Sequence, residues 1–206
     1  MRNNNKPCRR WSRRNKGFST VELVIVLAIM LVVSAVAMPN LIQIHRNYQL
    51  NDASAKMADI LKRTRFDAVR RDAVVNCQLL VGFAGPNTTS VWSDVPPARG
   101  AAGPLNTSTQ TLFIGQVGPV SAANVPNKGG LAAQVGAVAL NALNPAANPA
   151  ITFDQRGAVV APVGVNVIYL AHNGMPTLGY RAVVVLPSGS VQLWQADSTG
   201  AWHLFD

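Results

Sequence analysis

The sequence predicts an α+β protein in which one long N-terminal helix precedes a small β-rich domain. Three observations support this fold class. Residues 18–38 form an apolar run, residues 40–72 keep apolar residues at helical spacings of three and four, and short strand-like runs follow Val74. The chain has 206 residues, 49% of them hydrophobic, which suffices for one core of ordinary size.

Residues 1–17 form a basic leader. They hold seven of the eighteen Lys and Arg residues and no acid, so most of the net charge of +9 lies there. In residues 73–206 four cations are balanced by four aspartates. The sequence therefore predicts a neutral globular domain, and the basicity belongs to the leader.

Residues 18–38 are long enough to cross a membrane. Twenty-one residues give about 30 Å of helix, which matches the hydrocarbon thickness of a bilayer. Cations precede the run and no second run of this length follows. We therefore expect a single-pass membrane protein with a cytoplasmic N-terminus and the residues after Pro39 on the opposite side.

Other kinds of N-terminal segment share part of this pattern. A conventional signal peptide would use the small-x-small site Ala35-Val36-Ala37 and release a soluble β-domain after Ala37. A plain anchor and a twin-arginine signal at Arg13-Arg14 are further alternatives. The apolar run is long for a signal peptide, and none of the three needs the carboxylate of Glu22.

Glu22 makes membrane insertion of the apolar run less favourable, because an ionised carboxylate in a bilayer costs about 2.5 to 3.5 kcal/mol on insertion scales. In the simpler interpretation it reaches the headgroups at the cytoplasmic end. In the second interpretation, the Glu22 carboxylate pairs with a free α-amino group on a neighbouring subunit. Such an amine would exist if a peptidase cut between Gly17 and Phe18.

The stretch KGFSTVEL, residues 16–23, resembles the type III signal of type IV prepilins and type II secretion pseudopilins. The resemblance implies cleavage by a prepilin peptidase between Gly17 and Phe18, N-methylation of Phe18, a role for Glu22 in assembly, and a helix kink at Pro39. The implied partners are the prepilin peptidase, other pilins or pseudopilins in a filament, and an inner-membrane assembly platform. The protein would reside in the bacterial inner membrane, with its C-terminal domain in the periplasm, until it assembles.

Residues 39–73 are expected to extend the membrane helix as an amphipathic helix. One face repeats at helical spacing, at Leu50, Ala53, Met57, Ile60, Thr64 and Ala68. Three aspartates each precede a cation by four residues: Asp52 and Lys56, Asp59 and Arg63, Asp67 and Arg71. This order favours a solvated face of ion pairs over an anion-binding or subunit-contacting cluster.

Residues 74–206 are expected to form the β-rich domain. Strand-like runs cover 74–83, 111–117, 158–163, 165–171, 180–186 and 190–195. Pro187-Ser188-Gly189 should turn the last two into a hairpin. The Pro-, Gly- and Ala-rich region at about 85–150 is predicted to be mostly loop, with one short element at 131–143.

Three stretches, RFDAVRRDAVVNC, ITFDQRGAVV and YRAVVVLPSGSVQLW, resemble the GspH/FimT minor pseudopilin family. This resemblance implies the type IV pilin fold with two small antiparallel sheets as a sandwich, and a protein that primes or caps a filament. Some FimT-like members bind DNA for natural transformation through a Gly-Arg-x-Arg pattern. Here the corresponding residues 189–192 are Gly-Ser-Val-Gln, so a DNA-binding minor pilin is the less favoured alternative.

The sequence favours no enzyme, metal or cofactor. Its histidines are scattered, at positions 45, 172 and 203, and no glycine-rich phosphate loop follows a strand. We expect Asp154 to act in a turn. Cys77 should be a buried small hydrophobe, and Trp92, Trp194 and Trp202 should pack against sheets.

Overall fold

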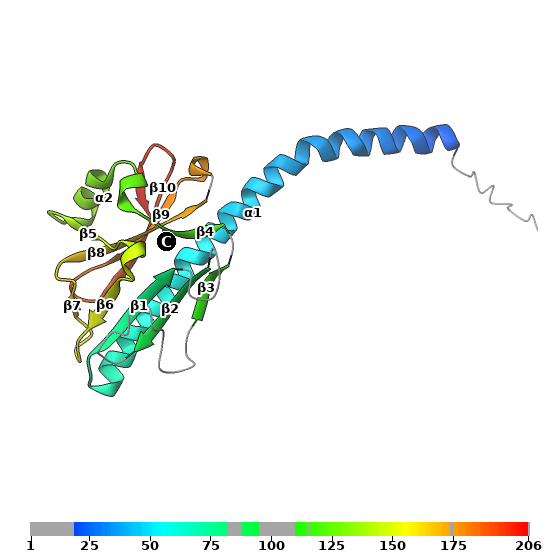
Figure 1. Cartoon of the computed structure of the whole chain (residues 1–206). Coiled ribbons are helices and arrows are strands. Elements are labelled where there is room, and N and C mark those ends of the chain that lie inside the picture. Colours follow the sequence, from blue (N-terminus) through cyan, green and yellow to red (C-terminus); the bar gives the residue numbers. More distant parts are fainter. Residues whose placement is uncertain (1–18, 82–87, 95–109, 115, 174, 206) are drawn as a thin grey trace, which may run out of the picture. The chain divides into compact units, whose positions relative to one another are not determined.

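The computed structural model describes residues 19–81, 88–94, 110–114, 116–173 and 175–205 (Figure 1). It divides into two compact units, Met1–Ile42 and Gln43–Asp206. One helix, α1 (Thr20–Arg71), contributes residues to both units. The order of a long N-terminal helix followed by two mainly antiparallel sheets confirms the predicted α+β class.

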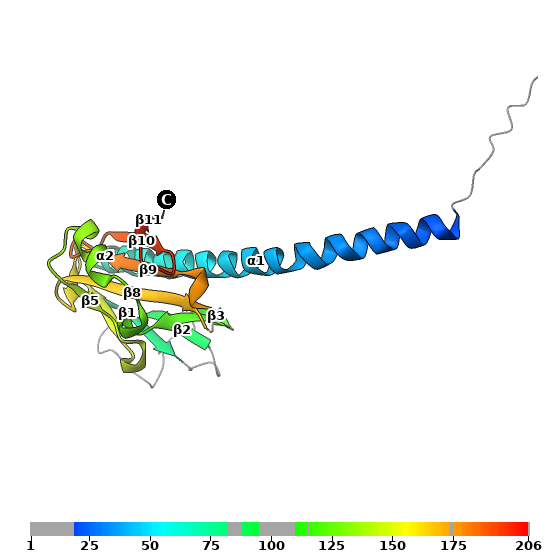
Figure 2. The ribbon, with the colours of Figure 1, turned by 90° about the horizontal axis from the view of Figure 1, so that it is seen from above.

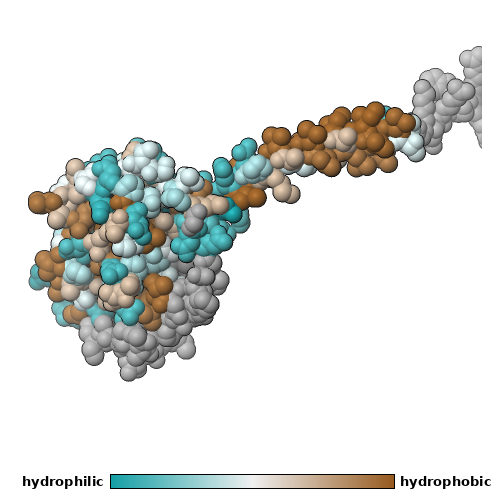
Figure 3. Space-filling model, turned by 45° about the horizontal axis from the view of Figure 1, so that its top comes forward, coloured by the Kyte–Doolittle hydropathy of each residue, from teal (hydrophilic) through white to brown (hydrophobic). Residues whose placement is uncertain are grey.

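In the first unit, α1 exposes apolar side chains on every side. All of its residues from Thr20 to Ile42 are exposed, and Figure 3 shows apolar side chains along this stretch on the face in view. Ser34 donates its hydroxyl to the carbonyl oxygen of Met30 at 2.7 Å, which satisfies that polar group within the helix. By length and composition this stretch could cross a membrane. Pro39 lies inside α1, and a kink there stays a prediction.

In the second unit, one face of α1 is buried against the sheets. All six residues of the predicted face are buried, and the neighbouring Ser54, Ala58 and Leu61 are buried with them. Thr64 tolerates burial because its hydroxyl donates to the carbonyl oxygen of Ile60 at 2.8 Å. The helix ends in a Schellman motif, with Asp72 in the left-handed region (φ 49°) and the amide of Ala73 bonded to the oxygen of Ala68.

The first sheet has five antiparallel strands in the order β3-β2-β1-β6-β7. Their bounds are β1 Val75–Val81, β2 Thr88–Asp94, β3 Gln110–Ile114, β6 Ala150–Phe153 and β7 Val159–Ala161. The second sheet has the order β11-β10-β9-β8-β4, with β5 added in parallel to β8. Its strands are β4 Val117–Val120, β5 Leu140–Ala142, β8 Val165–His172, β9 Tyr180–Val185, β10 Val191–Ala196 and β11 Trp202–Leu204. The two sheets confirm the expected antiparallel β-domain.

Two cores lie on the two faces of the second sheet. The larger core joins α1 to both sheets, and the smaller one lies under helix α2 (Lys128–Val135). Side chains of β8 alternate between them: Ile168 and Leu170 enter the larger core, whereas Val167 and Tyr169 enter the smaller. Figure 2 shows β8 beside β9 in this sheet. Because both faces are covered, β8 and β9 are apolar almost throughout.

The described part of residues 85–150 contains more helix and strand than the sequence predicts. Strand β3 overlaps the expected run 111–117, and strands β2, β4 and β5 and helix α2 lie there as well. Short 3₁₀ turns lie at Ala122–Asn124 and Pro145–Ala147, and a third such turn, η4, is Pro176–Leu178. Pro119 is compatible with a strand because, among the described strands, β4 lies at the edge of its sheet and pairs with β8 alone. The expected element at 131–143 is two elements, since Gly136 ends α2 in the left-handed region (φ 74°) before β5 begins.

Strand predictions for the last third of the chain are largely confirmed. Runs 165–171, 180–186 and 190–195 correspond to β8, β9 and β10, and the last two form the expected hairpin through Pro187–Gly189. The run 158–163 contains only the three-residue β7. Strands β6 and β11 were not expected, because each is four residues or fewer and gives almost no periodic signal.

The helix face that enters the larger core should dominate the stability of the second unit. Leu61 is fully buried there, so Leu61→Ala should lower the free energy of unfolding by about 2 to 5 kcal/mol. Val138→Ala is the matched control, since Val138 is fully exposed and its truncation should change stability by less than about 0.5 kcal/mol. Urea unfolding of the full chain in detergent, followed by near-UV circular dichroism, measures both; equal midpoints would contradict this packing.

Candidate functional site

The predicted processing residues lie at the start of the chain. Gly17 and Phe18 are outside the described residues, so their cleavage and methylation stay predictions. Glu22 lies in the first turn of α1 and is exposed among apolar side chains. A carboxylate is favourable at a helix N-terminus, where backbone amides carry partial positive charge. That benefit is smaller than the cost of burying an unpaired carboxylate in lipid.

The three stretches that resemble GspH/FimT proteins contribute to one polar cluster. Arg65 comes from α1, Gly157 from the turn between β6 and β7, and Gly189 from the turn between β9 and β10. The Nε of Arg65 donates to the carbonyl oxygen of Gly157 at 3.1 Å. The amide of Val159 donates to the oxygen of Pro187 at 2.9 Å, which joins the two turns directly. The cluster therefore fastens α1 to both sheets at once.

Two glycines make this close approach possible. Gly157 and Gly189 both lie in the left-handed region, with φ of 79° and 77°. A Cβ at Gly157 would stand 2.9 Å from Nε of Arg65, and a Cβ at Gly189 would collide with the carbonyl oxygen of Gly157. Glycine alone fits either position without displacing the backbone.

Asp154 has the turn role that the sequence predicts. Its Oδ1 accepts hydrogen bonds from the amides of Arg156 at 2.9 Å and Ala158 at 2.7 Å. These bonds hold the loop that presents the carbonyl of Gly157 to Arg65. Asp154 thus supports the polar cluster.

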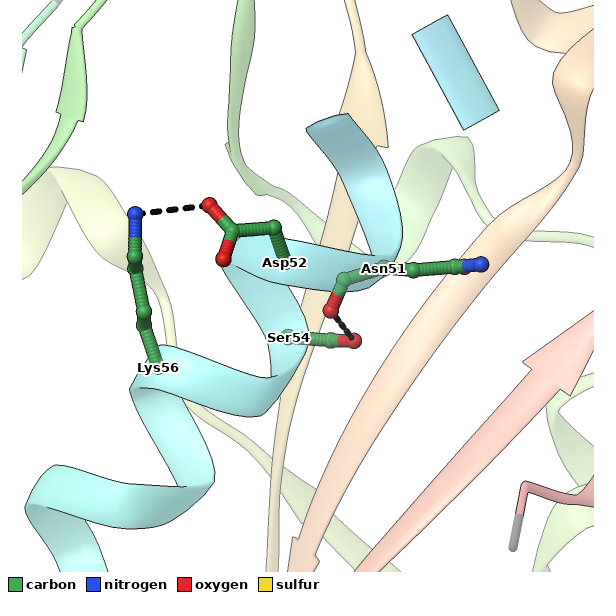
Figure 4. A network of polar contacts seen from close by, with 4 residues as sticks. All are labelled: Asn51, Asp52, Ser54 and Lys56. Carbon is green, nitrogen blue, oxygen red and sulfur yellow. Dashed lines mark hydrogen bonds and ion pairs between the residues drawn. The ribbon is translucent and has the colours of Figure 1, made fainter. Parts of the chain in front are cut away.

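The outer face of α1 carries the expected ion pairs, with one correction. Lys56 pairs with Asp52 at 2.6 Å (Figure 4), and Arg63 pairs with Asp59 at 2.8 Å. Asp67 pairs with Arg70 at 3.1 Å instead of Arg71, because residues three apart are also neighbours on a helix. The first two pairs are largely exposed, whereas in the third Arg70 is exposed and Asp67 is half-buried. Exposed pairs of this kind add only a few tenths of a kcal/mol. This face is therefore solvated, and the exposed Lys62 and Arg71 add positive charge beyond the three pairs.

Arg181 is a buried cation that sequence analysis missed. It lies on β9 among the side chains that face α1, where its Nε donates to Oδ1 of Asn51 at 2.8 Å and its Nη1 donates to the oxygen of Tyr180 at 3.0 Å. Burial lowers the pKa of the guanidinium by removing water from the charged form. A single arginine near the start of a strand carries no sequence signal for such a contact.

The thiol and the tryptophans have the packing roles that the sequence predicts. Burial raises the pKa of Cys77 to about 12, against a smaller opposing effect of a hydrogen bond with Thr64, so the thiolate is suppressed. Trp194 and Trp202 lie in the smaller core, and the ring of Trp202 stands 5.9 Å from that of Tyr169. The side chain of Trp92 is outside the described part of the chain. Within the described residues, no three His, Cys, Asp or Glu side chains gather as metal ligands would.

Comparisons with known proteins add two structural likenesses. No family model and no curated protein matches the sequence. Two crystal structures of the type IV minor pilin FimU from Pseudomonas aeruginosa strain PAO1 are similar to this chain. The P21 form is 16% identical with a TM-score of 0.48, covering 77% of this chain and 94% of that one. The P65 form is 17% identical with a TM-score of 0.45, and the match covers 76% of this chain and 98% of that one. At these values neither likeness establishes what this chain does.

The polar cluster of Arg65, Gly157 and Gly189 predicts that alanine substitution lowers stability at Gly189 but not at Gly129. Gly189→Ala should destabilise the protein by about 2 kcal/mol or more, because the methyl group needs both a left-handed backbone and the space of the Gly157 carbonyl. Gly129→Ala should be neutral or slightly stabilising, since it lies in α2 with open space around its Cβ. Thermal unfolding of the two variants compares them, and an equal loss in both would remove the role assigned to the cluster.

Proposed function

We propose that this chain is a minor pilin or pseudopilin that assembles into, or primes, a type IV pilus or a type II secretion pseudopilus. Prepilin peptidase cleaves it between Gly17 and Phe18 and methylates Phe18. The remaining apolar helix holds it in the inner membrane, with the β-domain in the periplasm, until the assembly platform draws it into a filament of other pilins.

One observation carries this proposal: a single helix serves both units of the chain. Its first part exposes apolar side chains all around, and its second part fills the core of the β-domain. The exposed part needs another apolar environment, which lipid or the helices of other subunits can provide. A subunit that moves between these two environments needs this architecture.

The position of Glu22 supports assembly over simple anchoring. In an isolated membrane helix the carboxylate is a net cost. In a filament, the methylated amine of Phe18 from a neighbouring subunit would neutralise it, because an opposite charge nearby favours the ionised form. The cost of Glu22 is then offset only on assembly, which gives each subunit a preferred axial position.

Glu22→Ala should therefore separate insertion from assembly. We expect the variant to enter the membrane and to be cleaved by the peptidase, while its recovery in sheared filaments falls at least tenfold. Asp59→Ala is the control, because it removes an exposed carboxylate from the same helix at a charge-balanced position. Immunoblots of membrane and filament fractions measure both variants. Normal recovery of the Glu22 variant would contradict the assigned role of this carboxylate.

A further inference from the structure

The apolar surface of α1 continues beyond Met38, where the sequence placed the end of the membrane segment. Leu41 is 63% exposed, and Ile44 is 49% exposed. The first cation after Lys16 is Arg46, so 29 consecutive residues of the chain carry no positive charge. A cation-free helix with an apolar surface is suited to lipid along its whole length.

An aromatic residue and a cation follow where this surface ends. Tyr48 is 68% exposed and lies one turn beyond Ile44 on the same face of the helix. From Val21 to Ile44, α1 is about 36 Å long, and from Val21 to Tyr48 about 42 Å. A bilayer measures about 30 Å across its hydrocarbon and 40 to 45 Å with its headgroups. Only one headgroup layer, about 5 to 8 Å thick, lies beyond the hydrocarbon on the far side. For a helix that enters the hydrocarbon at Val21 and tilts by about 20°, Arg46 lies about 35 Å and Tyr48 about 38 Å along the bilayer normal, in the far headgroup layer and at its outer edge.

Some cations of α1 are paired with aspartates, whereas Arg46, like Lys62 and Arg71, is in no ion pair among the described residues, and Arg46 is the one next to the apolar segment. Lys56, Arg63 and Arg70 each form an ion pair with an aspartate. The Nη1 of Arg46 points at the sulfur of Met175, which is a weak acceptor. The charge of the guanidinium is uncompensated there. A phosphate offers the two adjacent oxygens that a guanidinium binds best.

We propose that Arg46 binds the phosphate of an anionic phospholipid in the periplasmic leaflet, with the ring of Tyr48 in the same headgroup layer. This inference rests on the proposed function, because it needs α1 to be in a membrane. The unassembled subunit is held at a fixed depth, and assembly must release the lipid.

Spin labels on full-length protein in vesicles of phosphatidylcholine and phosphatidylglycerol test the depth. Labels at Tyr48→Cys and at Ala55→Cys, two turns further on the same exposed face, are compared in a Cys8→Ser background. Cys77 is buried with a suppressed thiolate, so it should stay unlabelled. We expect oxygen and nickel accessibilities to place position 48 in the headgroup layer and position 55 in water. Position 48 in bulk water would overturn the inference.

The lipid itself is tested with Arg46→Gln and the control Arg63→Gln. Native mass spectrometry of protein released from the same vesicles counts the retained phosphatidylglycerol. We expect about fivefold less lipid on the Arg46 variant, no change on the control, and no displacement by excess inorganic phosphate. Equal retention by both variants, or displacement by inorganic phosphate, would overturn the lipid site.

The two proposals fail in different ways. If the protein does not enter vesicles at all, the proposed function fails together with the lipid site. If it enters and both labels lie in water, or Arg46→Gln retains its lipid, the lipid site fails and the membrane helix stands.

Discussion

The fold of this protein depends on the packing of one helix face against two sheets. From Leu50 to Ala68, α1 buries its apolar residues in the core that both sheets share. At the far end of this contact Arg65 reaches the turns of both sheets, and nearer its start Arg181 reaches back from β9 to Asn51. The same helix therefore organises the domain and continues from the apolar segment Thr20–Ile42.

That arrangement explains why the two parts of α1 look so different in sequence. Within the domain, one face is apolar because it packs, and the other carries ion pairs because it is solvated. Before the domain, every face is apolar, and only Glu22 is charged. A helix that is apolar all around requires lipid or other helices. The lipid contact proposed for Arg46 lies where one pattern gives way to the other.

Long periodic elements could be predicted from the sequence, whereas short and non-local ones could not. All six residues expected on the buried face of α1 are buried, because side chains repeat reliably along a helix. Strand β4 was missed because Pro119 is tolerated only at a sheet edge, and edges are decided by tertiary pairing. The cluster of Arg65, Gly157 and Gly189 joins residues that lie far apart in the chain, which periodicity cannot detect.

The central claim is that a prepilin peptidase produces the mature protein, and its N-terminal mass tests that claim most directly. The protein would be purified from cells with and without the peptidase. The account predicts a chain that begins with N-methylated Phe18 and that keeps its leader when the peptidase is absent. A chain that begins at Met38 in both strains would contradict it, because α1 would then have been cut as a conventional signal peptide.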